Sequence, residues 1–136
     1  MLDDINAFRL RHHLAPLRVS LELTEAANQH SQEMAARGYF AHESANGAFF
    51  WQRIRRFYGS ADWSMWSVGE NLLWSSPGVS ASRALRIWEA SPPHRANLLT
   101  AQWREIGISA VHVPSAPGAF HGLGVTIVTT DFGVRR

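Results

Sequence analysis

Apolar residues recur at helical spacing near the start of the chain. Leu2, Ile5 and Phe8 lie about one turn apart, and His12 continues the same row. This spacing predicts a helix over residues 3–13, which Pro16 would end. One face of the segment suits a core and the other suits solvent.

The second predicted helix is the most strongly marked element. Ser20 can cap its start, and Gly38 can end it in a left-handed conformation. The apolar stripe between them, at spacings of four, three and four residues, contains Leu23, Ala27, His30 and Met34. Because His30 lies on this stripe, we expect it to be a buried histidine with a hydrogen-bond partner rather than a ligand.

Two more helices are predicted, over residues 47–58 and 80–90. Apolar residues in the first lie about a turn apart at Phe50, Ile54 and Phe57. Ser80 can cap the second, whose inward positions are Ala81, Ala84, Leu85 and Trp88. Pro92 and Pro93 stop this helix, so His94 is expected in a turn just beyond its end.

Strand-like alternation marks the middle and the end of the chain. One face of the first strand would hold Trp66, Val68, Glu70, Leu72 and Trp74. The last third alternates over residues 106–111 and 123–127, separated by a loop at 114–118 that is rich in turn-forming residues. Helices first and a β-hairpin last predict an α+β fold in which helices pack on an antiparallel sheet.

The length of 136 residues favours one domain over residues 1–136, and the 46% hydrophobic content fits a globular core. All 13 basic residues are arginine, and the net charge is only +2. The short run Arg53, Arg55 and Arg56 is interpreted as a solvated helix face. Without a clustered basic surface, nucleic-acid binding is not expected.

The chain has no cysteine, which excludes disulfides, thiolate chemistry and cysteine-ligated zinc. No apolar run approaches the ~20 residues that cross a membrane. The N-terminus has no basic segment followed by an apolar run, so it is not a signal peptide. The chain therefore either stays inside the cell or begins after a removed leader.

Three side chains are the candidates for chemistry. His42 and His94 each follow a predicted helix end, and Glu70 is the one carboxylate on an otherwise apolar strand face. Two imidazoles and a carboxylate match a catalytic zinc shell with an open position for water. The alternative is a buried hydrogen-bonded network that ties loops to the sheet.

Other chemistry has less support in the sequence. The chain has no HExxH helix and no Gly-x-Ser-x-Gly nucleophile elbow. Trp51, Trp63 and Trp66 could line a groove for an apolar ligand, but a role in the core is favoured because tryptophans usually bury large areas.

The order of short motifs resembles a cysteine-free bacterial domain of the CAP superfamily (cysteine-rich secretory, antigen 5 and pathogenesis-related 1 proteins). The similarity spans nearly the whole chain. Its segments are Asn6-Ala7-Phe8-Arg9, Pro16-Leu17, Ala27 to Ala35, Phe40-Ala41-His42, Gly69-Glu70-Asn71-Leu72, Trp88 with Ser91 to Leu99, Trp103 to Ile108, and Thr130-Asp131-Phe132-Gly133.

The resemblance implies an α-β-α sandwich with a central antiparallel sheet and a cleft that gathers His42, Glu70 and His94. In the eukaryotic branch, two histidines and two glutamates can bind a divalent metal such as zinc. The second glutamate of that branch falls on Ser91 here, and the adjacent Glu89 would point elsewhere. The family is mainly secreted, and its members are linked to lipid binding, proteolysis and protein–protein signalling.

Three hypotheses follow for the function. The first is a secreted, extracellular or periplasmic binding module, expected to be a monomer, whose cleft takes a metal ion, a lipid or a protein partner. The second is a metal-assisted hydrolase in which His42 and His94 hold Zn²⁺ or another divalent cation and Glu70 is the base or third ligand. In the third, the three residues form a purely structural network, and the function lies in surface contacts with proteins.

Overall fold

The computed structural model describes all residues from Met1 to Arg136. Its elements are α1 (Leu2–Arg11), β1 (Arg18–Val19), α2 (Leu21–Arg37), α3 (Phe50–Phe57), β2 (Trp66–Ser75), α4 (Ala81–Ala90), α5 (Pro92–Leu98), β3 (Glu105–Val113), the 3₁₀ turn η1 (Gly118–Phe120) and β4 (Val125–Arg135). None of the helices is long and apolar enough to span a membrane.

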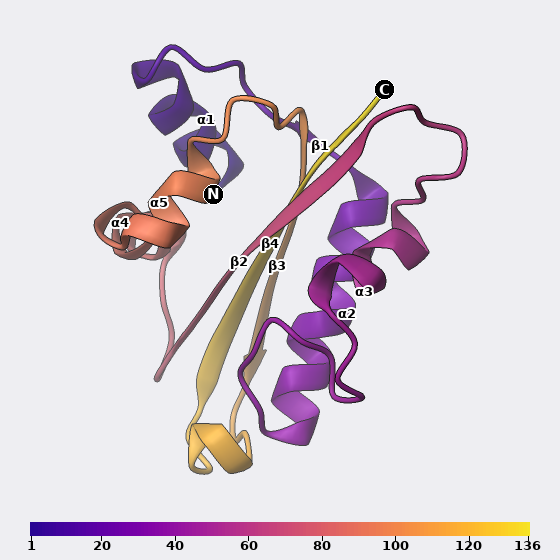
Figure 1. Ribbon diagram of the computed structural model, residues 1–136. Coiled ribbons are helices and arrows are strands. Elements are labelled where there is room, and N and C mark those ends of the chain that lie inside the picture. The colour runs from indigo at the N-terminus through magenta and orange to yellow at the C-terminus, as the bar shows by residue number, and fades with distance from the viewer.

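A four-stranded sheet forms the middle layer, with strand order β1-β3-β4-β2. The neighbours β3–β4 and β4–β2 are antiparallel, and the short β1 adds a parallel edge. Figure 1 shows α2 and α3 on one face of the sheet and α1, α4 and α5 on the other. This is the predicted α-β-α sandwich, with β2 at one edge of the sheet.

Each face of the sheet has its own apolar core. On the α1/α4/α5 side, Trp88, Leu98 and Ile106 belong to the larger buried cluster. On the other side, Met34 and Leu72 belong to one cluster and Leu23 and Ile54 to another. The sheet therefore buries both faces, and only its edges and loops remain to form sites.

The most strongly marked predicted helix is confirmed at both ends. Ser20 accepts a hydrogen bond from the backbone N–H of Leu23, and Gly38 is left-handed with φ of 69°. Gly107 lets this helix lie close to the sheet, because a Cβ there would come within 2.0 Å of the Leu23 backbone. His30 is fully buried, and its Nε2 is 2.8 Å from the Ala41 carbonyl oxygen.

The structure corrects several boundaries, among them the start of the third helix, which is Phe50 rather than residue 47, and the start of the last strand, which is Val125 rather than residue 123. The first helix ends at Arg11, earlier than predicted, because His13 takes a left-handed conformation with φ of 60°. The last strand continues to Arg135 rather than ending near residue 127. This extension brings Asp131 into the sheet directly opposite Glu70.

Candidate functional site

The three predicted site residues lie around the free edge of β2. His42 lies in the loop between α2 and α3, with its side chain 49% exposed, and Glu70 is buried on β2. His94 lies in the short helix α5 rather than in a turn, which corrects the prediction. Pro92 begins that helix instead of only ending the one before, because the first helical turn needs no N–H from it.

Glu70 has a partner on each carboxylate oxygen. Oε1 is 2.8 Å from Nδ1 of His42, and Oε2 accepts from the Arg53 guanidinium. A second nitrogen of Arg53 donates to the His42 carbonyl at 3.0 Å. Arg53 therefore ties the histidine loop and the strand carboxylate together from α3.

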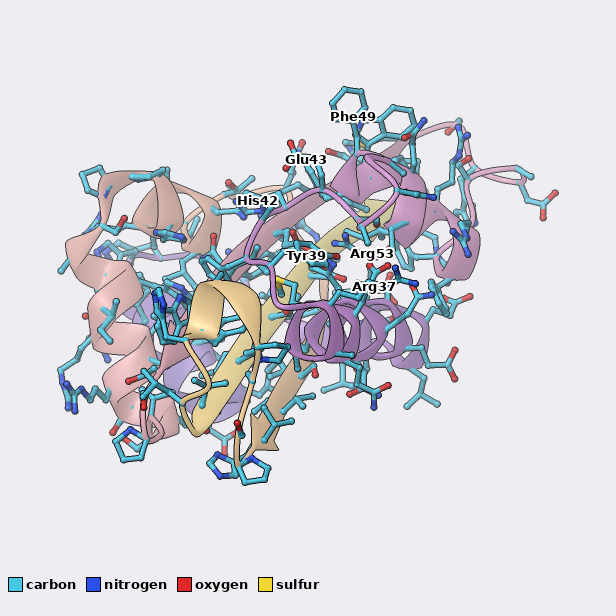
Figure 2. All side chains as sticks on the ribbon, turned by 90° about the horizontal axis from the view of Figure 1, so that it is seen from below. Arg37, Tyr39, His42, Glu43, Phe49 and Arg53 are labelled. Atoms are coloured by element: carbon cyan, nitrogen blue, oxygen red, sulfur yellow. The ribbon has the colours of Figure 1, made fainter.

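This role for Arg53 corrects the interpretation of the arginine run as a solvated face. Arg55 and Arg56 are exposed, but Arg53 is only 2% exposed. Figure 2 shows Arg53 turned inward between α3 and α2, while Glu43 and Phe49 point outward. The available signal was its position three residues after Phe50, on the apolar stripe of its own helix.

Asp131 is the other site residue that the sequence did not single out as one. It lies across from Glu70 on β4 and is fully buried, and its carboxyl interacts with the Glu70 carboxyl rather than with any other side chain within regular hydrogen-bond distance. Two carboxyls on adjacent strands cannot both ionise cheaply beside one guanidinium. If the last strand had been predicted to continue past residue 127, its alternation would have placed Asp131 on the same face of the sheet as Glu70.

The electrostatics follow from burial. Burial raises the pKa of Glu70 to about 7 despite the Arg53 charge. Burial and the Glu70 carboxyl raise the pKa of Asp131 well above its ordinary value. Asp131 is thus the carboxyl that keeps its proton longer, and Glu70 is the one that ionises first because Arg53 stabilises its negative charge.

His42 is held as a neutral ring in one tautomer. Burial is the main cause that lowers its pKa. Since a carboxylate only accepts hydrogen bonds, Nδ1 of His42 donates to Glu70 and Nε2 is left as an acceptor. The network therefore presents an unprotonated imidazole nitrogen at the edge of the sheet.

His94 has a local partner instead. Its Nδ1 lies 2.7 Å from Oγ of Ser91, and its ring stacks on Trp88 with centroids 6.4 Å apart. Burial lowers the pKa of His94, and His42 adds to the effect. Ser91, which takes the position of the second glutamate, thus holds the ring without contributing a charge.

All three residues face one groove, although only His42 and Glu70 are in contact. His94, His42 and Glu70 bound a hollow of about 410 Å³ that also includes Asn97. Gly69 lets β2 lie close to Asn97 of α5, because a Cβ at this position would lie 2.6 Å from Oδ1 of Asn97. We call this hollow, together with the adjoining one described next, the cleft.

The adjoining hollow, of about 610 Å³, shares His42, Glu70 and Asn97 with the first. One of its walls is an aromatic shelf, defined as Phe49, Phe50 and Trp51. Phe49 is 56% and Trp51 37% exposed, and their rings stack 6.4 Å apart. Trp51 therefore lines a groove, against the core role favoured from the sequence, and Trp63 is exposed as well.

The donor set fits a metal poorly. No group of three His, Cys, Asp or Glu side chains is arranged to hold a metal ion. Glu70 is occupied by His42 and Arg53, so His42 and His94 could each offer only an Nε2 atom. A structural or catalytic zinc site needs three or four protein ligands.

Comparison with known proteins agrees with the fold. The sequence profile of CAP, the cysteine-rich secretory protein family, matches residues 2–130. An extracellular protein containing an SCP domain from Bacillus anthracis is 26% identical and superposes with a TM-score of 0.75 over 99% of this chain. An outer surface protein from Borrelia burgdorferi is 18% identical and superposes with a TM-score of 0.78 over 99% of this chain. This chain covers 90% of the Borrelia protein.

The similarity covers only part of some relatives. The chain spans 39% of the Bacillus anthracis protein. The uncharacterized membrane protein YlbC of Bacillus subtilis is 30% identical over 108 residues, which is 79% of this chain and 30% of YlbC. With a family profile along nearly its whole length and the matching sandwich fold, this chain belongs to the CAP family of cysteine-rich secretory proteins.

Proposed function

We propose that this chain is a secreted binding module that takes an amphipathic ligand, such as a single-chain lipid, in the cleft along β2. One observation carries the proposal: the exposed aromatic shelf adjoins the polar group formed by His42, His94 and Asn97. Binding sites for small molecules combine an apolar wall with a few placed polar groups in this way. The extracellular and outer-surface descriptions of two similar proteins support secretion.

The two sides of the cleft suit the two ends of such a ligand. The stacked Phe49 and Trp51 rings offer a flat apolar surface that is costly to leave in water. His42 offers a nitrogen acceptor, and Asn97 an amide. Neither side needs to rearrange, because the buried Arg53–Glu70 pair fixes the loop that carries His42.

The probe is monomeric lysophosphatidylcholine, followed by NMR of the tryptophan indole N–H groups. Trp51 and Trp103 line the cleft, whereas Trp74 packs against Phe120 and serves as an internal reference. We expect saturable shifts at Trp51 and Trp103, with Trp74 unmoved. Shifts spread over all tryptophans, or none at all, would contradict the proposal.

A shelf variant locates the binding. Phe49→Ala removes an exposed ring, so the fold should survive, and we expect the lipid affinity to fall about tenfold from the lost contact area. Trp63→Ala removes an aromatic ring of similar exposure that does not line the cleft, and should leave the affinity unchanged. Equal loss in both variants would mean nonspecific adsorption.

Metal-assisted hydrolysis is the second candidate, favoured by the Glu70 pKa of about 7, which suits proton transfer near neutrality. It has less support because Glu70 would have to leave Arg53 and His42 to act as base or ligand. Loss of both zinc uptake and hydrolysis in His94→Ala would favour it. Hydrolysis that survives a strong chelator would exclude it.

A further inference from the structure

The loop that joins α2 to α3 contains the dipeptide Asn46-Gly47. An asparagine side chain can be attacked by the backbone nitrogen of the next residue, and glycine hinders this attack least because it has no Cβ. Alanine, glutamine or leucine follows each of the other asparagines, which are Asn6, Asn28, Asn71 and Asn97. Asn46 is therefore the asparagine of this chain that is most open to deamidation.

The backbone nitrogen of Gly47 is accessible in the folded chain. Asn46 and Gly47 are both exposed, and a Cβ built on Gly47 would meet no atom within 4 Å beyond its chain neighbours. Gly47 has a φ of 84°, a left-handed conformation that favours glycine over residues with a side chain. The fold thus favours, at this position, the one residue that cannot shield the nitrogen.

The turn also places a donor on the oxygen that gains charge during the attack. Oδ1 of Asn46 accepts from the Ala48 backbone N–H at 3.0 Å. When Cγ is attacked, negative charge develops on this oxygen, and a donor already in place stabilises it. The Gly47 N–H donates to the Ser44 carbonyl at 2.8 Å, so the attack begins when this single turn bond opens.

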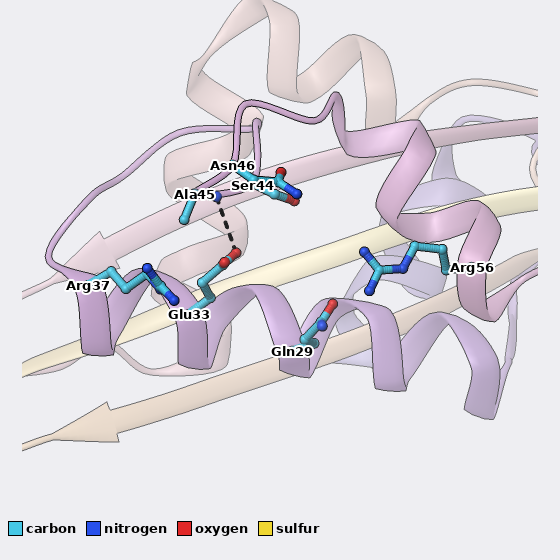
Figure 3. Close-up of a pocket in the computed structure, with 7 residues that line it drawn as sticks. All are labelled: Gln29, Glu33, Arg37, Ser44, Ala45, Asn46 and Arg56. Carbon is cyan, nitrogen blue, oxygen red and sulfur yellow. Dashed lines mark hydrogen bonds between the residues drawn. The ribbon is translucent and has the colours of Figure 1, made fainter.

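The surroundings favour a negative charge at position 46. Asn46 lines a polar pocket of about 330 Å³ between α2 and α3. Figure 3 shows Arg37 and Arg56 at the two ends of this pocket, with Glu33 between them. Neither arginine forms an ion pair with a carboxylate of the chain. Two cations and one anion leave the local potential positive, which stabilises both the anionic nitrogen that attacks and a carboxylate product.

We propose that Asn46 deamidates spontaneously in the folded protein, which adds a carboxylate to the pocket and loosens the loop. The Gly47 nitrogen gives its proton to hydroxide and bonds to Cγ of Asn46. The Cγ–Nδ2 bond then breaks, and ammonia leaves with a proton taken from water. Water opens the resulting five-membered succinimide at either carbonyl and gives aspartate or isoaspartate. One water is consumed and one ammonia is released, and the inference does not rest on the function proposed above.

The isoaspartate product changes the loop as well as the charge. Its backbone runs through the former side chain and is one methylene longer, so the hydrogen bonds that the turn makes at Ser44 and Ala48 lose their geometry. The loop runs from His42, on one side of the cleft, to Phe49, on the aromatic shelf. The modification therefore acts on the cleft through the segment that joins its two sides.

The test is incubation of the folded chain at mildly alkaline pH, followed by trypsin digestion and mass spectrometry. Cleavage after Arg37 and Arg53 leaves Asn46 as the only asparagine in its peptide, and cleavage after Arg18 isolates Asn28 in the same way. We expect progressive conversion of Asn46, with an isoaspartate fraction, and none of Asn28, which is also exposed but lies within α2. A zero-time sample corrects for conversion during digestion. No conversion of Asn46, or equal conversion of Asn28, would overturn the proposal.

A pair of glycine variants separates the chemistry from the fold. Gly47→Ala shields the attacking nitrogen and should abolish the conversion over the same incubation. Gly59→Ala, at a glycine with equally open space, should leave the conversion unchanged. In the converted protein, purified by ion exchange, we expect faster amide hydrogen exchange at Gly47 and Ala48, because the turn bonds are lost. Conversion that persists in Gly47→Ala, or amide exchange that is unchanged after conversion, would contradict the proposal.

Discussion

The two histidines of the cleft line the same hollow but are anchored differently. His42 donates to Glu70, which is paired with Arg53 and lies beside Asp131, so α3 and β2 together hold one loop. His94 relies on Ser91, three residues earlier, and on the ring of Trp88. One side of the cleft is therefore a buried charged network, and the other is a local, uncharged contact.

This difference shows that a histidine motif does not by itself determine which nitrogen of the histidine ring carries the proton. A buried carboxylate fixes which nitrogen of His42 carries the proton, whereas a hydroxyl can donate to His94 or accept from it. The stability of the fold should thus depend on the His42 side far more than on the His94 side. Four predictions test this contrast, in order of decreasing effect.

Removing the buried cation should break the His42 side. Arg53→Met leaves Glu70 and Asp131 without a positive charge, and we expect the free energy of unfolding to fall by about 3–5 kcal/mol. Arg55→Met, on the exposed side of the same helix, should cost less than about 1 kcal/mol. Urea denaturation measures both, and a loss in Arg53→Met as small as the one expected for Arg55→Met would show that the buried pair is dispensable.

Removing the buried acid should have a pH-dependent effect. The pKa of Asp131 is raised in the folded state, so the folded protein keeps a proton that the unfolded chain releases above pH 3.8. The contribution of Asp131 therefore lowers the free energy of unfolding as pH rises from there. Asp131→Asn escapes this cost. It should match the wild type near pH 4 and exceed it at pH 8 by about 1 kcal/mol or more.

Thermal or urea unfolding across pH measures that difference. Asp62→Asn makes the same substitution at an exposed position and is the control. A difference between Asp131→Asn and the wild type that does not change with pH would mean that Asp131 is ionised in the folded protein.

The two histidine rings should respond independently to their own partners. Glu70→Gln should change the tautomer of the His42 ring, since a glutamine amide can donate to Nδ1 as well as accept from it, and should leave the ring-nitrogen shifts of His94 unchanged. Ser91→Ala should alter the tautomer of His94 alone. Long-range nitrogen–proton NMR of the imidazoles measures both, and a response of both rings to one substitution would mean that the two sides are coupled.

The smallest of the four effects is expected when zinc is added to the wild-type chain. Because Glu70 is engaged by Arg53, we expect no saturable micromolar binding in calorimetry at neutral pH. Ser91→Glu adds a carboxylate beside His94 and should raise the affinity. Micromolar binding by the wild type that disappears in the His42→Ala, His94→Ala double variant would instead support the metal hypothesis.

Much of the fold could be predicted because its signals are local. The cap at Ser20, the left-handed Gly38 and the alternation around Glu70 each depend on near neighbours in the chain. Boundaries failed where a distant contact decided them. The last strand makes this plain, since it continues to Arg135 by pairing with β2 as far as Trp66.

Part of the site could also be predicted, because His42, Glu70 and His94 occur in short motifs beside helix ends or on a strand. Their partners could not be predicted in the same way. Arg53 resembled its exposed neighbours, and Asp131 lay beyond the predicted end of its strand. A pairing between residues on different elements has no period that a local pattern can reveal.

The sequence by itself determined the family, the sandwich fold and the three polar residues at the cleft, because repeated spacing and ordered motifs specify elements and their faces. Only the tertiary structure decided how those residues are used. The register of β2 against β4 puts Glu70 opposite Asp131, and the packing of α3 inserts Arg53 beside them. Burial then determines which carboxyl keeps its proton, since the cost of an ion depends on every neighbour that excludes water.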